Sequence, residues 1–311
     1  MARQQRIDHF NLWPKAQKFQ AEIRFAELLQ PYPLEDLFFP YQLPDTDNRE
    51  SHIMISYLLD AVDSLPYRPD HAFDWVWRAF EFSCKQVPGC KDNTSKALRS
   101  VSSKLNDYFN VNSEVGDAFF ELVSDVPIRT CKFLLKKIVE EGVYEFSGDG
   151  HKSFSIFAKR ILFANGGPPV VSTSLQSILH YLCWHYRAVG GLELRSGAAL
   201  LRRILRGERV ELGGSFYQLS RAEILFLTLS GLAYSFRNGR AHAESIAPFR
   251  SSLAKVQTYA HCWFMFLVIY ELTFALQHIS AYPNKLDGTP VDNFRKNNAA
   301  FSKLFKSCLG S

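Results

Sequence analysis

Apolar residues recur at helical spacing along most of this chain. The clearest case lies within residues 71–85, where large apolar side chains follow one another at intervals of four, three and four positions: Phe73, Trp77, Phe80 and Cys84. Such spacing places side chains on one face of a helix. Similar patterns predict helices at 52–65, 94–109, 114–125, 128–141, 174–189, 195–209, 220–236 and 251–279. The sequence therefore predicts a mainly α protein, an enlarged helical bundle.

One short β-hairpin interrupts this helical pattern. The alternating runs ERVEL and SFYQL flank the pair Gly213-Gly214, and a two-residue glycine turn between alternating runs is typical of a hairpin. Prolines punctuate the first 48 residues, which are expected to form an extended N-terminal segment. The helical domain is expected at 49–285, with a candidate internal seam near 146–173 where turn residues gather, and a C-terminal tail at 286–311.

Composition indicates a folded protein that does not cross a membrane. Apolar residues make up 47% of the chain and aromatic residues 14%, enough for a large core. The most apolar run, residues 262–270, is much shorter than a membrane span, and the first 13 residues have no apolar signal-peptide core. The six cysteines show no metal-finger or paired spacing. A cytoplasmic location, reduced thiols, no metal and no cofactor are the expectations.

Positive charge concentrates in the second part of the chain. Residues 195–311 carry 15 Lys and Arg against 7 Asp and Glu, whereas residues 1–194 carry 21 against 24. Four arginines lie on or just after one predicted helix and are candidate RNA-binding residues: Arg202, Arg203, Arg206 and Arg209. A solvated helix face explains the same pattern equally well.

The segment FRNGRAHAE, residues 236–244, carries the candidate chemistry, because it joins two long apolar helical patterns within the basic region. Arg237 can hold two phosphate oxygens and keeps its charge. His242 can exchange a proton near neutral pH. Asn238 can orient the imidazole or a phosphate oxygen, and Arg240 can add a phosphate contact. These residue types suit RNA cleavage through attack of the 2′-hydroxyl.

The spacing of Arg and His is by itself weak evidence for a nuclease motif. In a chain with nine His and many Arg, such a spacing has about an even chance of arising by accident. The adjoining Asn238, the small Ala241 and the basic surroundings are separate features that agree with it. A single His cannot easily serve as both acid and base. We therefore expect a symmetric homodimer that brings two copies of the motif together.

RNGRAH resembles the motif of the HEPN superfamily of helical-bundle ribonucleases, in which Arg and a polar residue precede a His. Residues 74–81, DWVWRAFE, are similar to the aromatic first helix of some members, which ends in a Glu. The resemblance implies that His242 is the general acid or base, that Arg237 stabilises the phosphorane-like state and that Asn238 supports both. It also implies metal-independent cleavage, a 2′,3′-cyclic phosphate product and an active site completed by dimerisation.

Members of that superfamily commonly act as toxins or as antiphage and abortive-infection effectors, so an antitoxin or a regulatory protein is a candidate partner. Glu81, if it faces the motif, is expected to hold the guanidinium of Arg237. Two alternatives stay open. The chain is either a non-catalytic RNA- or protein-binding module of a larger assembly, or the arginine-rich helix and the hairpin form a winged DNA-binding element.

Overall fold

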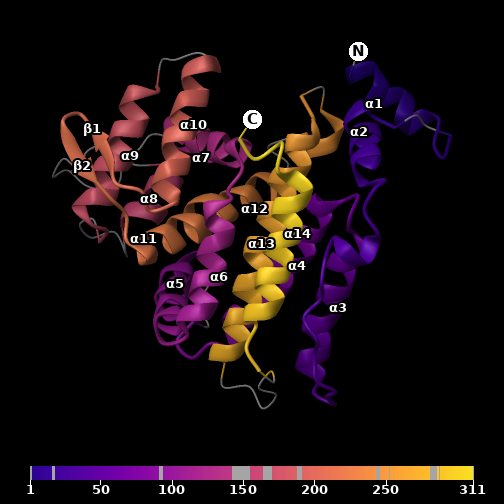
Figure 1. Cartoon of the computed structure of the whole chain (residues 1–311), viewed down its shortest axis with the longest axis horizontal. Coiled ribbons are helices and arrows are strands. Elements are labelled where there is room, and N and C mark those ends of the chain that lie inside the picture. The colour runs from indigo at the N-terminus through magenta and orange to yellow at the C-terminus, as the bar shows by residue number, and fades with distance from the viewer. Residues whose placement is uncertain are drawn as a thin grey trace.

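The structure is a computed structural model of the whole chain. It describes residues 2–15, 18–90, 94–141, 155–163, 170–187, 191–242, 246–251, 253–280, 286 and 288–310. Helices dominate it, as the sequence predicts, and one small hairpin is the only sheet within these residues (Figure 1). The first half contains α1 (Ala2–Asn11), α2 (Gln20–Leu29), the 3-10 helix η1 (Leu34–Asp36), α3 (Arg49–Asp63), α4 (Pro69–Gln86), α5 (Thr94–Val111), α6 (Ser113–Ser124) and α7 (Ile128–Glu141). The second half contains α8 (Ile156–Leu162), α9 (Thr173–His185), α10 (Gly191–Leu205), β1 (Val210–Leu212), β2 (Ser215–Tyr217), α11 (Arg221–Phe226), the π-helix η3 (Leu227–Ala233), α12 (Tyr234–Ala241), the 3-10 helix η4 (Pro248–Arg250), α13 (Val256–Ile279) and α14 (Val291–Phe305).

The centre of the fold is α13, which packs against α4, α5, α6 and α14 (Figure 1). Its length and composition would suffice for a membrane span, but 83% of its most apolar stretch is buried inside the protein. A helix that is apolar on all sides must be enclosed by other elements. The described part of the chain surrounds α13 with amphipathic helices, as expected of a core helix.

The expectation of an extended segment at 1–48 is wrong, because α1 and α2 lie within it. Ala21, Phe25 and Leu29 recur every fourth position and are all buried. The Phe25 ring stacks on that of Tyr259 in α13, with 3.8 Å between ring centroids. Pro14 lies between α1 and α2 and the other prolines lie beyond α2, so they limit these two helices without interrupting them. The longest described stretch of this segment without regular structure is 38–48.

The expectation of a C-terminal tail at 286–311 is also wrong. Within it α14 packs on α6 and α13, and Phe294 and Phe305 are fully buried. One continuous apolar core extends from Ala21 in α2 to Leu309 after α14. The apolar periodicity of α14 is interrupted by polar Asn297 and Asn298, which are nevertheless buried. Much of the candidate seam at 146–173 lies outside the described residues.

The hairpin confirms its sequence signature. β1 and β2 pair antiparallel, with Val210 opposite Tyr217 and Leu212 opposite Ser215. Gly213 and Gly214 have φ of +57° and +81°, which are left-handed values that glycine adopts without steric cost. The hairpin therefore forms where the sequence alone predicts it.

A single helical run from α11 through η3 to α12 carries the RNGRAH motif. It begins with a capping box, in which Ser220 Oγ accepts from the Glu223 amide at 3.3 Å and Glu223 Oε2 accepts from the Ser220 amide at 2.9 Å. Arg160 of α8 holds the middle of this run. Its side chain donates to the carbonyl of Ser230 in η3 and to the hydroxyl of Ser235 in α12, each at 2.8 Å. Since a π turn holds an extra residue, it sets which face α12 presents to its neighbours.

Candidate functional site

The motif helix α12 is held against α4 by aromatic packing. The rings of Phe73 and Phe236 meet edge to face with centroids 4.8 Å apart, and those of Trp77 and Tyr234 lie 6.0 Å apart. Phe73, Trp77 and Phe236 are buried. This contact fixes the polar edge of α4 beside the two arginines of α12.

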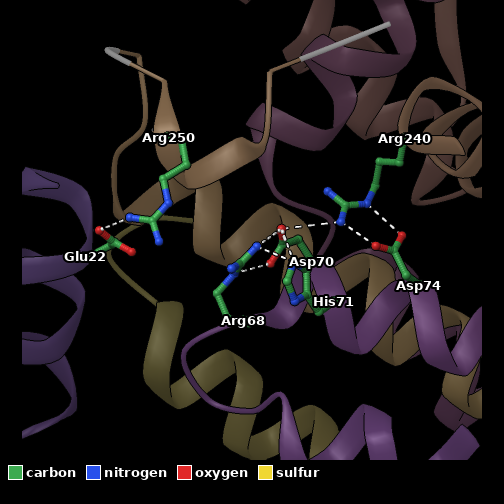
Figure 2. Close-up of polar contacts among 7 residues, drawn as sticks. All are labelled: Glu22, Arg68, Asp70, His71, Asp74, Arg240 and Arg250. Atoms are coloured by element: carbon green, nitrogen blue, oxygen red, sulfur yellow. Dashed lines mark hydrogen bonds and ion pairs between the residues drawn. The ribbon is translucent and has the colours of Figure 1, made fainter. Parts of the chain in front are cut away.

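Arg240 is engaged by two carboxylates of α4. Its Nε donates to Asp74 Oδ1 at 2.7 Å and its Nη2 to Asp74 Oδ2 at 2.5 Å, while Nη2 also lies 3.4 Å from Asp70 Oδ2 (Figure 2). Burial alone would lower the pKa of Arg240, but the hydrogen bonds and charges of these carboxylates raise it. Arg240 therefore ties α12 to α4. The phosphate contact expected of it would have to compete with both carboxylates.

Asp70 connects Arg240 to a second arginine. Arg68 donates from Nε and Nη2 to the two carboxylate oxygens of Asp70, at 3.0 and 2.9 Å (Figure 2). Asp70 is fully buried, which would raise its pKa, but the hydrogen bonds and charge of Arg68 and the charge of Arg240 lower it. Arg68 also contacts His71, and burial together with the two guanidinium charges lowers the pKa of His71. Asp70 is thus an ionised bridge between two cations.

A separate pair in the same view joins the N-terminal helices to the loop that follows the motif. Arg250 Nη1 of η4 donates to Glu22 Oε2 of α2 at 2.8 Å (Figure 2). The guanidinium of Arg250 also lies 5.1 Å from the centre of the Phe19 ring. Phe19 and Glu22, at the start of α2, therefore hold Arg250 and with it the segment between α12 and α13 in place.

Arg237 contacts Glu81, as the sequence analysis expects. Nη2 of Arg237 lies 3.4 Å from Glu81 Oε1, and Nη1 lies 3.3 Å from Asn238 Oδ1. The side chains of Arg237 and Glu81 are 33% and 24% exposed. Both contacts are long for charge-assisted hydrogen bonds. Arg237 is therefore oriented by Glu81 yet remains open to an additional anion.

His242 lies just beyond the C-terminal end of α12 and is exposed. Its amide donates to the Asn238 carbonyl at 2.9 Å, and its side chain forms no hydrogen bond or ion pair with the described residues. The structure places Arg237 and Asn238 next to each other, but it does not bring the imidazole into their hydrogen-bonding group.

A pocket of about 440 Å³ opens between α4 and α12. It is lined by Asp74, Trp77, Arg78, Glu81, Arg237, Arg240, Ala241 and Ala247. His242 is not among these residues, although it directly follows Ala241. Trp77 Nε1 is buried and has no hydrogen-bond partner within the described chain. Because Arg240 is already neutralised, the cations at the pocket that can still meet an anion are Arg237 and the exposed Arg78.

The four arginines assigned to an RNA-binding helix differ in the groups that they contact. Arg203 pairs with Glu208 at 2.8 Å, and the Arg206 Nε donates to the Ser124 carbonyl at 2.7 Å. Arg209 lies 4.6 Å from the centre of the Phe216 ring in the hairpin. Arg202 is half-buried, and burial together with the charge of Arg206 lowers its pKa. Each guanidinium therefore has a different environment.

All six cysteines are buried and free, as expected of reduced thiols. Burial raises the pKa of the Cys131 thiol to about 12, so this group is neutral at physiological pH. In the described part of the chain, no group of three or more His, Cys, Asp or Glu residues is arranged to hold a metal ion.

Asp70 and Asp74 are not among the site residues that the sequence predicts. A signal for them exists, since Asp70, Asp74 and Glu81 are four and seven positions apart and so share one edge of α4. An acidic edge on an otherwise apolar helix indicates a cationic neighbour. The nearby sequence does not show that Arg237 and Arg240 pair with this edge, because both lie on another helix, α12.

Comparison with family models, with curated proteins and with solved structures finds no match for this chain. The assignment of function therefore depends on the residues and geometry described above.

Proposed function

We propose that this protein is a metal-independent endoribonuclease in which Arg237 binds the scissile phosphate and His242 transfers protons. The observation that carries the proposal is the state of Arg237, a partly exposed guanidinium at a pocket wall, oriented by Glu81 through a single 3.4 Å contact. Such a guanidinium can accept a second anionic partner without leaving its position. His242 lies five residues further along the chain and is exposed to solvent.

The reaction is a transesterification within the RNA. The 2′-oxygen forms a bond to phosphorus while the bond from phosphorus to the 5′-oxygen breaks. A neutral imidazole takes the proton of the 2′-hydroxyl, and an imidazolium gives a proton to the leaving 5′-oxygen. Arg237 stabilises the extra negative charge on the phosphate oxygens. The products are a 2′,3′-cyclic phosphate and a 5′-hydroxyl.

Two imidazoles are needed for this proton balance, and each chain contributes one His at the motif. Because His242 lies outside the pocket of its own chain, we propose that two copies associate through the exposed end of α12. The two motifs would then meet at one shared site, where both imidazoles and Arg237 face a single phosphate. Asn238, which accepts from Arg237, would help to orient the phosphate.

Arg240, Asp74 and Glu81 have positioning roles in this proposal. The bidentate pair between Arg240 and Asp74 holds the end of α12 on α4, and Glu81 limits the rotation of the Arg237 guanidinium. The likeness of RNGRAH to the HEPN motif supports a biological role as a toxin or as an antiphage or abortive-infection effector. Such an enzyme would need an antitoxin or another regulatory protein as partner.

The alternative is a non-catalytic RNA- or protein-binding module. The separation of His242 from the pocket favours this alternative, because an exposed imidazole away from Arg237 would have no role in proton transfer. In that case the His242→Ala substitution would alter partner affinity but no cleavage rate.

The test uses purified wild-type protein, His242→Ala and the matched control His185→Ala, which also removes an exposed imidazole. Each is incubated with total cellular RNA and separately with tRNA in excess EDTA, and fragment ends are analysed for cyclic phosphate. Cleavage by the wild type and the control, but not by His242→Ala, is the expected result. Absence of cleavage by folded, dimeric wild-type protein would overturn the proposal and favour the binding module.

A further inference from the structure

A second and larger cleft, of about 880 Å³, lies at the opposite end of the helical run that carries the motif. It is lined by residues of α6, α11, α14 and the segments flanking the hairpin, and its three cations are Arg206, Arg221 and Arg295. Arg221 begins the run and Arg237 lies 16 positions later, so helical rise separates the two by roughly 24 Å. The cleft is therefore distinct from the Arg237 pocket.

Arg206 is fixed in this cleft without being neutralised. Its Nε donates to the Ser124 carbonyl at the end of α6, at 2.7 Å, and no carboxylate among the described residues pairs with it. A neutral carbonyl holds the guanidinium in place while leaving its charge and its terminal nitrogens for another partner. The neighbouring Arg202 adds further positive potential.

The two other arginines differ from each other. Arg221 Nη1 lies 2.7 Å from Asp117 Oδ1, and its guanidinium lies 5.0 Å from the centre of the Phe120 ring. Arg295 is exposed on α14 and pairs with no carboxylate in the described chain. Glu121 also lines the cleft, opposite in sign to the arginines. Arg206 and Arg295 are thus the arginines of this cleft that form no ion pair among the described residues.

We propose that this cleft binds the phosphate group of a nucleotide unit, with Arg206 and Arg295 as its charge partners. The volume lies within the usual range of small-molecule sites, about 300–1,000 Å³, and fits a nucleotide. Apolar side chains of Phe120, Leu219 and Ile224 line the same space and give the nucleoside a surface to pack on. The ligand is either a free nucleotide or one unit of an RNA strand, which share this chemistry. The site does not require catalysis at Arg237.

The test compares the double variant Arg206→Gln/Arg295→Gln with Arg24→Gln/Arg195→Gln. The control removes the same charge from two exposed arginines that do not line the cleft. One probe is AMP, followed by calorimetry. The other is a fluorescent 2′-O-methyl dodecauridine, followed by anisotropy at several NaCl concentrations. The 2′-O-methyl group prevents cleavage, so affinity is measured whether or not the protein is a nuclease.

We expect the cleft variant to bind at least one probe about tenfold more weakly than the wild type, and the control to change it less than threefold. If the strand is the ligand, the magnitude of the slope of log affinity against log salt should fall by about 0.7 to 1.4, as expected for one or two lost phosphate contacts on a single strand. Loss of AMP binding would identify a free nucleotide. Equal affinities of the two double variants for both probes, or binding of neither probe by the wild type, would overturn the proposal.

Discussion

Glu271 lies in the middle of α13 and is fully buried, and this gives the strongest prediction about stability. Neither carboxyl oxygen has a hydrogen-bond partner among the described residues. Asn298 is nearby, but its amide nitrogen donates instead to the Ala118 carbonyl at 2.9 Å. Burial therefore dominates and raises the pKa of Glu271 well above its ordinary value of 4.5. The group is a neutral acid over a pH range in which a solvent-exposed glutamate is ionised.

The consequence for stability follows from proton linkage. Above about pH 4.5 the unfolded chain releases the proton of Glu271, whereas the folded chain keeps it. Unfolding then releases one proton, so the free energy of unfolding falls by about 1.4 kcal/mol for each pH unit, until the folded-state pKa is reached. A glutamine has nearly the same shape as a glutamic acid and does not titrate. Glu271→Gln should therefore abolish this fall of the free energy of unfolding with pH.

Urea denaturation of the wild type, Glu271→Gln and the exposed control Glu114→Gln at pH 5, 6 and 7 measures the effect. The stability of Glu271→Gln relative to the wild type should rise by about 1.4 kcal/mol per pH unit, and that of the control should stay constant. Comparing differences removes the contributions of all other titrating groups. Parallel profiles for wild type and Glu271→Gln would refute a buried neutral carboxyl.

Three further outcomes are expected. Asp70→Asn should lower the free energy of unfolding at pH 7 by about 1.5–3 kcal/mol, because it removes the charged hydrogen bonds of Arg68, whereas Arg240 keeps its pair with Asp74. Since the folded pKa of Asp70 is lowered, its contribution in the wild type should be lost progressively as pH falls from about 4 through that lowered pKa; equal urea midpoints for variant and wild type at pH 7 would contradict this. Gly116→Ala should cost about 1–3 kcal/mol in calorimetric or urea unfolding, since an added Cβ would lie 2.9 Å from Phe109 Cβ and 3.1 Å from its carbonyl oxygen. If the proposed nuclease function holds, Glu81→Gln should slow RNA cleavage about tenfold or more without changing Tm, because the partly exposed pair with Arg237 positions the guanidinium and adds little stability; an unchanged rate would show that Glu81 has no positioning role.

Much of the local structure was predictable because its causes are local. Apolar spacing within 71–85 gives α4, the Ser220 and Glu223 pair begins α11, and two glycines with positive φ make the hairpin turn. Each of these features depends on residues a few positions apart. The sequence also identified the Arg237 and Glu81 contact, because both residues carried a distinct chemical signal.

The tertiary structure determines which charged side chains can still bind a ligand. Arg240 and Asp74 are 166 positions apart, and their pairing turns an expected phosphate ligand into a link between helices. Asp70, in the first turn of α4, is buried between two arginines. Periodicity cannot specify such contacts, because they depend on how separate helices pack and on the π-helical turn of η3 that sets the face of α12.

The positions of α14 and His242 show the same limit. The sequence was interpreted as a C-terminal tail, although Val291, Phe294, Phe301 and Leu304 recur at helical spacing; packing of this face against α6 and α13 stabilises α14. His242 follows Arg237 by only five positions, yet it lies beyond the end of α12 and outside the pocket. Sequence alone determined which chemical groups the motif contains. Packing determined which of them face one another, because side-chain contacts over long sequence separations exist only once the core has formed.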